Sequence, residues 1–173
     1  MNNRRISIML VLLVTALWVL PVAAQPLEEG YTIFACEIAQ LDPGEMWTSG
    51  DNVLHIRNQV VVHKVYADNP LLRGYNTVTR NLDINLKTGQ VHVFGSFDYK
   101  VEGVDGSWVG RFTIHSEPGV PYWGNGTAQG TGELKGITQK TQFAPIPPDY
   151  PNNPCENAAT TGMHTVFFID HRK

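Results

Sequence analysis

Apolar and polar residues alternate with a period of two through much of this chain, and that alternation constrains the fold more than any other feature. The pattern is clearest in three runs, at residues 82–86, 91–101 and 108–115, joined by hairpin-type turns at 87–90 and 103–106. Successive side chains of a β-strand point to opposite faces, so each run presents two different faces. The tight turns between the runs predict an antiparallel meander.

The rest of the chain supports the same interpretation. Residues 53–56, 60–66 and 160–170 are rich in β-branched or aromatic residues and are bounded by turn residues, which predicts three more strands. Residues 31–41 fit a helical stripe as well as a strand face, and the β-rich context favours a strand. No other stretch predicts a long helix, so the predicted fold class is all-β.

Glycine is concentrated in one part of the chain, since 11 of the 16 glycines lie between Gly89 and Gly136. Between residues 124 and 136 five of them share one parity, so a single long strand there would have one face almost without side chains. Glycine inside a strand is entropically costly. We therefore expect Gly130 and Gly132 to be structural, at a sharp bend or under aromatic side chains of neighbouring strands. The candidates for that cover are Phe97, Tyr99, Trp108 and Phe112.

The N-terminus has the composition of a secretory signal peptide. Two arginines precede an apolar run at residues 6–20, and small residues at 22–24 match a signal-peptidase site. The run is shorter than the roughly 20 residues of a membrane-spanning helix, and no second apolar stretch approaches that length. We predict a signal peptide at residues 1–24, a single domain without a membrane span at residues 25–173, and a secreted or periplasmic location.

The charge of the predicted mature chain limits its partners. Removing the two arginines of the signal peptide leaves 11 of the 13 basic residues against 16 acidic ones, a net charge of −5. The basic residues are scattered along the chain. Nucleic acid and anionic membranes require a concentrated basic face, so neither is a predicted partner.

The predicted mature chain has two cysteines, Cys36 and Cys155, which lie 119 residues apart. In an oxidising compartment a single pair of this kind predicts a disulfide. Cys155 follows a connection at residues 144–157 that is rich in proline and cannot continue a sheet. The disulfide would therefore tie this connection to the first predicted strand.

Motifs that carry catalytic chemistry are absent from the sequence. It has no Gly-x-Ser-x-Gly elbow, no His-x-x-x-His and no Cys-x-x-Cys, so no catalytic residue, metal site or cofactor is predicted. His55 and His63 share a parity, but a break between two predicted strands separates them. Polar residues on the strand faces are solvated if the aromatic face points inward, and form a buried acid–base group if the polar face does. These residues are His92, Asp98, Arg111, His115 and Glu133.

Residues 95–138 carry a resemblance to a known family. The segments 106–110 (GSWVG) and 130–136 (GTGELKG) resemble the G-S-W-x-G and G-x-G-x-L-x-G segments of bacterial barrel proteins related to the allene oxide cyclase and dirigent superfamily. The resemblance implies a single antiparallel β-barrel of about eight strands, closed or nearly closed, calycin-like or allene-oxide-cyclase-like, with a central cavity. None of the family's catalytic residues can be placed on this sequence, so it implies no particular activity.

Three functions suit such a barrel. The first is binding of a small apolar or amphipathic ligand, or of an envelope partner, and is supported by 3 Trp, 6 Tyr and 7 Phe in residues 25–173. The second is a cavity enzyme of the cyclase or isomerase type, which needs a strongly perturbed acid or histidine inside the barrel. The third is a structural or interaction module of the cell envelope. We expect a cavity at one end of the barrel, with ligand-binding residues Phe97, Trp108, Arg111, Phe112, Trp123 and Glu133.

Overall fold

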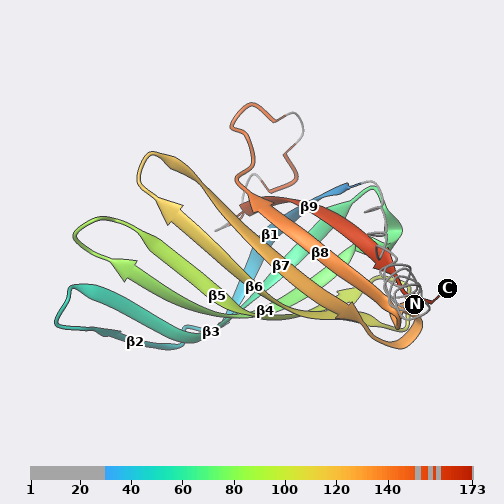
Figure 1. Cartoon of the computed structure of the whole chain (residues 1–173), viewed down its shortest axis with the longest axis horizontal. Helices are drawn as coiled ribbons and strands as arrows, with labels where there is room; N and C mark the ends of the chain where they lie inside the picture. The colour runs from blue at the N-terminus through green and yellow to red at the C-terminus, as the bar shows by residue number, and fades with distance from the viewer. Residues whose placement is uncertain (1–29, 151–152, 156–157, 159–160, 173) are drawn as a thin grey trace, which may run out of the picture.

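Nearly all of the described chain is β-structure (Figure 1). The computed structural model describes residues 30–150, 153–155, 158 and 161–172, so the predicted signal peptide at 1–24 lies outside the described residues. Two short 3-10 turns, η1 (Pro70–Leu72) and η2 (Gly132–Leu134), precede β4 and β8. The strands are β1 (Tyr31–Asp42), β2 (Glu45–Thr48), β3 (Val53–Ala67), β4 (Gly74–Asn85), β5 (Val91–Val101), β6 (Ser107–Glu117), β7 (Val120–Gly130), β8 (Ile137–Ala144) and β9 (Thr161–Asp170).

Eight of these strands form a closed antiparallel barrel (Figure 1). Hydrogen-bonded neighbours follow the order β1-β9-β8-β7-β6-β5-β4-β3, and β1 also pairs with β3, which closes the ring. From β3 to β9 the strands form a continuous meander in which neighbours in sequence are neighbours in space. The additional strand β2 pairs with the start of β3, outside the ring. The predicted antiparallel barrel is therefore confirmed. Within the described part of the chain, no helix has the length and apolar character needed to cross a membrane.

Two strands, β3 and β4, are longer than the sequence predicts, and a third, β1, settles an ambiguous prediction. The runs at 53–56 and 60–66 belong to one strand, β3, whose register against β4 shifts between Ile56 and Gln59. Asn58 has a φ of 57° at this shift, a conformation that asparagine tolerates better than most residues. β4 extends well upstream of the predicted run, and the segment that fitted both helix and strand is strand β1.

Large side chains and the two 3-10 turns close one end of the barrel. Leu72 and Leu134, one from each turn, are buried, and Trp108 of β6 is fully buried. The Trp108 indole donates a hydrogen bond to the carbonyl oxygen of Leu71 at 3.3 Å, and the Tyr99 hydroxyl donates one to the carbonyl oxygen of Leu72. Both of these bonds fix η1 against the strands, whereas η2 is held by the backbone amides of Thr131 and Glu133, which donate to the carbonyl oxygens of Ser107 and Asp105. We call Leu72, Tyr99, Trp108 and Leu134 the floor of the barrel.

The glycine-rich segment is not one long strand but two strands separated by a turn. β7 ends at Gly130, and η2 intervenes before β8. Gly132 has a φ of 55°, which other residues rarely adopt. A Cβ on Gly130 would lie 2.1 Å from the carbonyl oxygen of Leu134. Backbone, rather than an aromatic ring, is thus the nearest obstacle at Gly130. Aromatic cover occurs at Gly126, where a Cβ would lie 3.1 Å from the ring of Phe143.

A disulfide joins Cys36 and Cys155, as predicted, with their Cα atoms 5.1 Å apart. Cys36 is in β1, and Cys155 is in the proline-rich connection between β8 and β9. On the same side of β1, Phe34 packs against Tyr150 of this connection with ring centroids 5.0 Å apart. These contacts tie Tyr150 and Cys155 of the connection to the outer side of β1.

Loss of the disulfide should lower the stability of the barrel. Cys36→Ala is expected to reduce the free energy of unfolding by about 2–4 kcal/mol, because the cross-link restricts a long loop in the unfolded chain. Urea denaturation of Cys36→Ala, Cys155→Ala and the double variant measures this loss, and the three variants should be equally stable. Two titratable thiols in unfolded, unreduced wild-type protein would contradict the pairing.

Substitution of Gly130 should destabilise the barrel through a backbone clash. Gly130→Val is expected to lower the free energy of unfolding by about 1–3 kcal/mol, since the new side chain must displace the Leu134 carbonyl group. Gly50→Val is the matched control, because no atom lies within 4 Å of a Cβ at that position. Thermal unfolding followed by circular dichroism compares the two. An unchanged midpoint for Gly130→Val would show that this close approach is dispensable.

Candidate functional site

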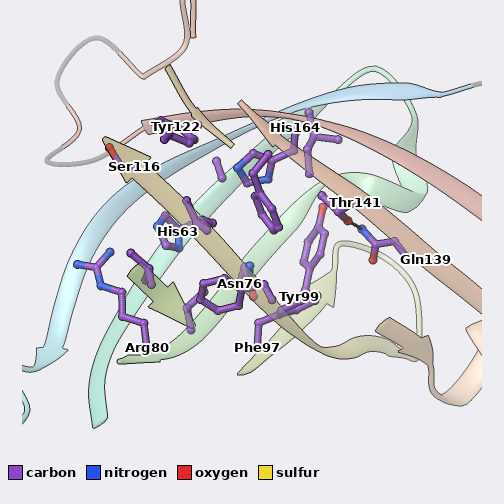
Figure 2. Close-up of a pocket in the computed structure, with 18 residues that line it drawn as sticks. His63, Asn76, Arg80, Phe97, Tyr99, Ser116, Tyr122, Gln139, Thr141 and His164 are labelled. Carbon is purple, nitrogen blue, oxygen red and sulfur yellow. Dashed lines mark hydrogen bonds between the residues drawn. The ribbon is translucent and has the colours of Figure 1, made fainter. Parts of the chain in front are cut away.

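The barrel contains a cavity of about 260 Å³ above its floor (Figure 2). Residues of all eight barrel strands line it, from Ile33 on β1 to His164 on β9. Tyr99 of the floor forms its lower boundary, whereas Ser116 and Tyr122, near the hairpin that joins β6 and β7, lie toward the opposite end. Because inward and outward side chains alternate on every strand, the cavity wall is made by one parity of each strand.

Three phenylalanines form a continuous aromatic part of this wall. The ring of Phe112 on β6 lies 6.5 Å from that of Phe97 on β5 and 6.0 Å from that of Phe143 on β8, measured between centroids. β7 separates β6 from β8, and its inward position 126 is glycine. The ring of Phe143 therefore covers Gly126 and reaches toward Phe112. A predominantly apolar wall of this kind suits a ligand with an apolar body.

Three polar atoms of the wall have no hydrogen-bonding partner among the described residues. They are Nδ1 of His63, Oδ1 of Asn76 and Oε1 of Gln139, and each is buried. His63 and Asn76 face each other across the register of β3 and β4, and Gln139, on β8, is only 2% exposed. Buried polar groups in folded proteins are nearly always paired. Three unpaired atoms in one cavity therefore mark positions that a bound molecule can complete.

Two histidines of the wall are held in the neutral form. Burial lowers the pKa of His63 to about 4, against an opposing effect of Glu37 and with a further contribution from the charge of Arg80. Burial also lowers the pKa of His164 to about 3, and the nearby His63 adds to this effect. The His164 ring packs edge-on against Phe143, with centroids 4.5 Å apart. At neutral pH each imidazole has one donor and one acceptor nitrogen.

Arg80 brings a positive charge to the cavity wall, but that charge is compensated. Its Nη1 donates to the carboxylate of Glu37 at 3.1 Å, and its Nε donates to Oε1 of Gln59 at 2.6 Å. The side chains of Glu37 and Arg80 are only 7% and 17% exposed. A buried ion pair is stable only when its hydrogen bonds are satisfied as well. The guanidinium is therefore held by Glu37 and Gln59, and its charge is neutralised by Glu37.

Of the six residues predicted to bind a ligand, two line the cavity and one lies beneath it. Phe97 and Phe112 face the interior, as the parity of their strands requires. Trp108 belongs to the floor, where it is fully buried and stacks on Phe168 at 5.2 Å between ring centroids. It supports the cavity without lining it.

The other three predicted residues lie outside the cavity. Arg111 is an exposed residue of β6, next to the inward-facing Phe112, and Glu133 is exposed in η2. Trp123 is 56% exposed, and its ring stacks on His115 at 4.7 Å on the outer face. The polar face of these strands therefore points outward, so the alternative of a buried acid–base group around Arg111 and Glu133 is wrong. Arg111 and Asp98 point outward because the aromatic face of their strands points inward, whereas Glu133 is outside the cavity because it lies in the turn η2.

The polar residues of the cavity were not among the residues predicted from the sequence, and His63 shows why. The bulge at Asn58 adds one residue to β3, so odd-numbered residues point outward before it and inward after it. His55 therefore lies on the outer face, stacked on Trp47 at 5.2 Å and bonded through Nδ1 to Asp83 at 2.6 Å. His63 has the same parity in sequence and lines the cavity. Only the register shift distinguishes them.

No group of three or more His, Cys, Asp or Glu side chains that could hold a metal ion occurs among the described residues. Comparisons of the chain with protein-family models, with characterised proteins and with solved structures give no match. The resemblance to the allene oxide cyclase and dirigent superfamily stays a prediction.

The two neutral histidines should make the protein less stable in acid. In the unfolded chain their pKa is near 6.5, and in the folded protein it is lower. Between pH 6.5 and pH 4 the unfolded state therefore binds protons that the folded state excludes. Above pH 6.5 both histidines are neutral in the folded and in the unfolded state, so they do not lower the free energy of unfolding. Below pH 6.5 the free energy of unfolding should fall by at most about 1.4 kcal/mol per pH unit for each histidine.

Urea denaturation between pH 7 and pH 4.5 measures this dependence. His63→Gln and His164→Gln should each make the decline in the free energy of unfolding shallower, and the double variant should show the smallest decline. The same pH dependence in the wild type and in all three variants would contradict the assignment of neutral buried histidines.

Proposed function

We propose that this protein binds a small, mainly apolar molecule inside its barrel. The observation that carries the proposal is the cavity of about 260 Å³, lined by all eight strands, in which unpaired polar atoms interrupt a mostly apolar wall. Ligand sites are typically concave and apolar with a few placed polar groups. The volume is at the small end for such sites, which suits a compact molecule of one or two rings.

The proposal includes action outside the cytoplasm. The Cys36–Cys155 disulfide is compatible with an oxidising compartment. The charged start, apolar run and small residues of the predicted signal peptide at 1–24 favour the same location. A secreted or periplasmic binding protein is the function that these features support together.

A second candidate function, a cavity enzyme of the isomerase or cyclase type, is favoured by the two buried histidines. Such an enzyme needs a base beside its substrate, and the neutral imidazole of His63 has an unpaired Nδ1 atom in the wall. The low pKa makes His63 a weak base, so simple binding is the stronger proposal. The two functions are distinguished by incubating the protein with a compound that it binds and using chromatography to see whether the compound is converted to a product. Turnover that is lost in His63→Gln would favour the enzyme.

Filling the cavity should abolish binding. Val93 lines the cavity, and Val93→Phe adds a ring inside it. Val109→Phe is the matched control, because Val109 is 47% exposed on the adjacent strand. Isothermal titration calorimetry with 2-methylnaphthalene should show saturable binding to the wild type and to Val109→Phe, and none to Val93→Phe. Circular dichroism checks that both variants are folded. Equal binding by both variants would place the site elsewhere.

A further inference from the structure

We infer that the ligand of this cavity is uncharged and donates a hydrogen bond from each of two opposite ends of an apolar body. The inference rests on the proposed binding function and specifies the chemical class of its ligand. Three features carry it: the positions of the unpaired amide oxygens on the barrel, the compensated charge of Arg80, and the aromatic wall between them.

The two unpaired amide oxygens lie on opposite walls. In the closed ring of eight strands, β4 and β8 are four strands apart in either direction. Asn76 projects from β4 and Gln139 from β8 into the same cavity (Figure 2). A molecule that reaches both oxygens must therefore extend across the barrel interior. This excludes a ligand with a single polar group as the best match to the cavity.

In both amides the oxygen atom is buried and has no hydrogen-bonding partner among the described residues. Nδ1 of His63 lies on the strand next to Asn76, and Oδ1 of Asn76 has no partner among the described residues. The amide nitrogen of Gln139 is directed to Oγ1 of Thr141 at 3.4 Å, which leaves Oε1 as its unpaired end. An amide oxygen only accepts hydrogen bonds, so the complementary ligand group is a donor. A hydroxyl group fits best beside Asn76, because it can also bond the neutral imidazole of His63.

The charges of the wall argue against an ionised ligand. Arg80 is the charged residue among the described lining residues, and its guanidinium is bonded to Glu37 and Gln59. A ligand carboxylate would have to break that buried pair or remain unpaired in the cavity, and both outcomes are costly. The His63 and His164 imidazoles are neutral and supply no compensating charge.

The space between the two amides is apolar. Phe97, Phe112 and Phe143 line it from β5, β6 and β8. Rings of this kind pack well against a flat aromatic or cyclic body. The resulting class is a compact diol or diphenol with one hydroxyl group at each end of a ring system.

Calorimetry with five matched naphthalenes tests the inference on the full protein. The compounds are 2,6-dihydroxynaphthalene, 2-naphthol, 2,6-dimethylnaphthalene, 2,6-dimethoxynaphthalene and 2,6-naphthalenedicarboxylate. We expect the dihydroxy compound to bind most tightly and each hydroxyl group to improve the affinity roughly tenfold, because it satisfies an otherwise unpaired buried oxygen. The dicarboxylate should bind most weakly.

Two near-isosteric variants locate the effect. Asn76→Leu and Gln139→Met should each weaken binding of the dihydroxy compound roughly tenfold and leave the affinity for 2,6-dimethylnaphthalene unchanged. Asn125→Leu and Gln142→Met are matched controls, since both side chains are exposed on the outside of β7 and β8. The controls should bind every compound as the wild type does.

The outcomes distinguish this inference from the proposed function. If the dimethyl and dihydroxy compounds bind equally, the barrel is a binding protein and the two-donor inference is wrong. Tightest binding of the dimethoxy compound would show that the cavity presents donors instead, and tightest binding of the dicarboxylate would show a free positive charge. Either result overturns the inference alone. If none of the five compounds binds, the proposed function fails with it.

Discussion

The pairing of β1 with both β3 and β9 is the interaction on which the rest of the structure depends. Without β1, strands β3 to β9 would form an open sheet whose β9 edge is unpaired and whose β3 edge is paired only at its start, by β2. β1 fills the gap with eight antiparallel pairs to β3 and six to β9. Closure gives every barrel strand an inside and an outside. The interior, and therefore the candidate site, exists only because this one strand completes the ring.

Within the closed ring, residue size separates the floor from the cavity. Trp108, Tyr99 and Leu72 fill the end where the two 3-10 turns dock. Above them, the glycines of β7 leave room for Phe143, and the inward positions of β3 and β4 are His63 and Asn76. An eight-stranded barrel can be filled by side chains alone. Here side chains fill only the floor end of the barrel, and the unpaired polar atoms lie beside the cavity that remains above it.

The alternation in the sequence was enough to predict the strand class, the meander and the inward direction of Phe97 and Phe112. It could not predict which strands oppose one another, because closure depends on contacts between residues more than one hundred positions apart. The bulge at Asn58 also reverses the parity of β3, so His63 could not be placed inside from its spacing to His55. Trp123 was misplaced because it was predicted from its position next to the glycine-rich run in sequence, whereas its ring stacks on His115 on the outer face.

The closing strand β1 comes near one end of the chain, and its partner β9 comes near the other. During synthesis, more than one hundred further residues must therefore be made before β1 can pair with β9 and complete the ring. The Cys36 thiol likewise has no partner until Cys155 has been made. Such long-range pairing makes folding slow and leaves apolar strand faces exposed in the meantime. A nascent chain that stops before β9 is thus not a smaller version of the protein. It has no interior at all, and its unpaired edges are available to other chains.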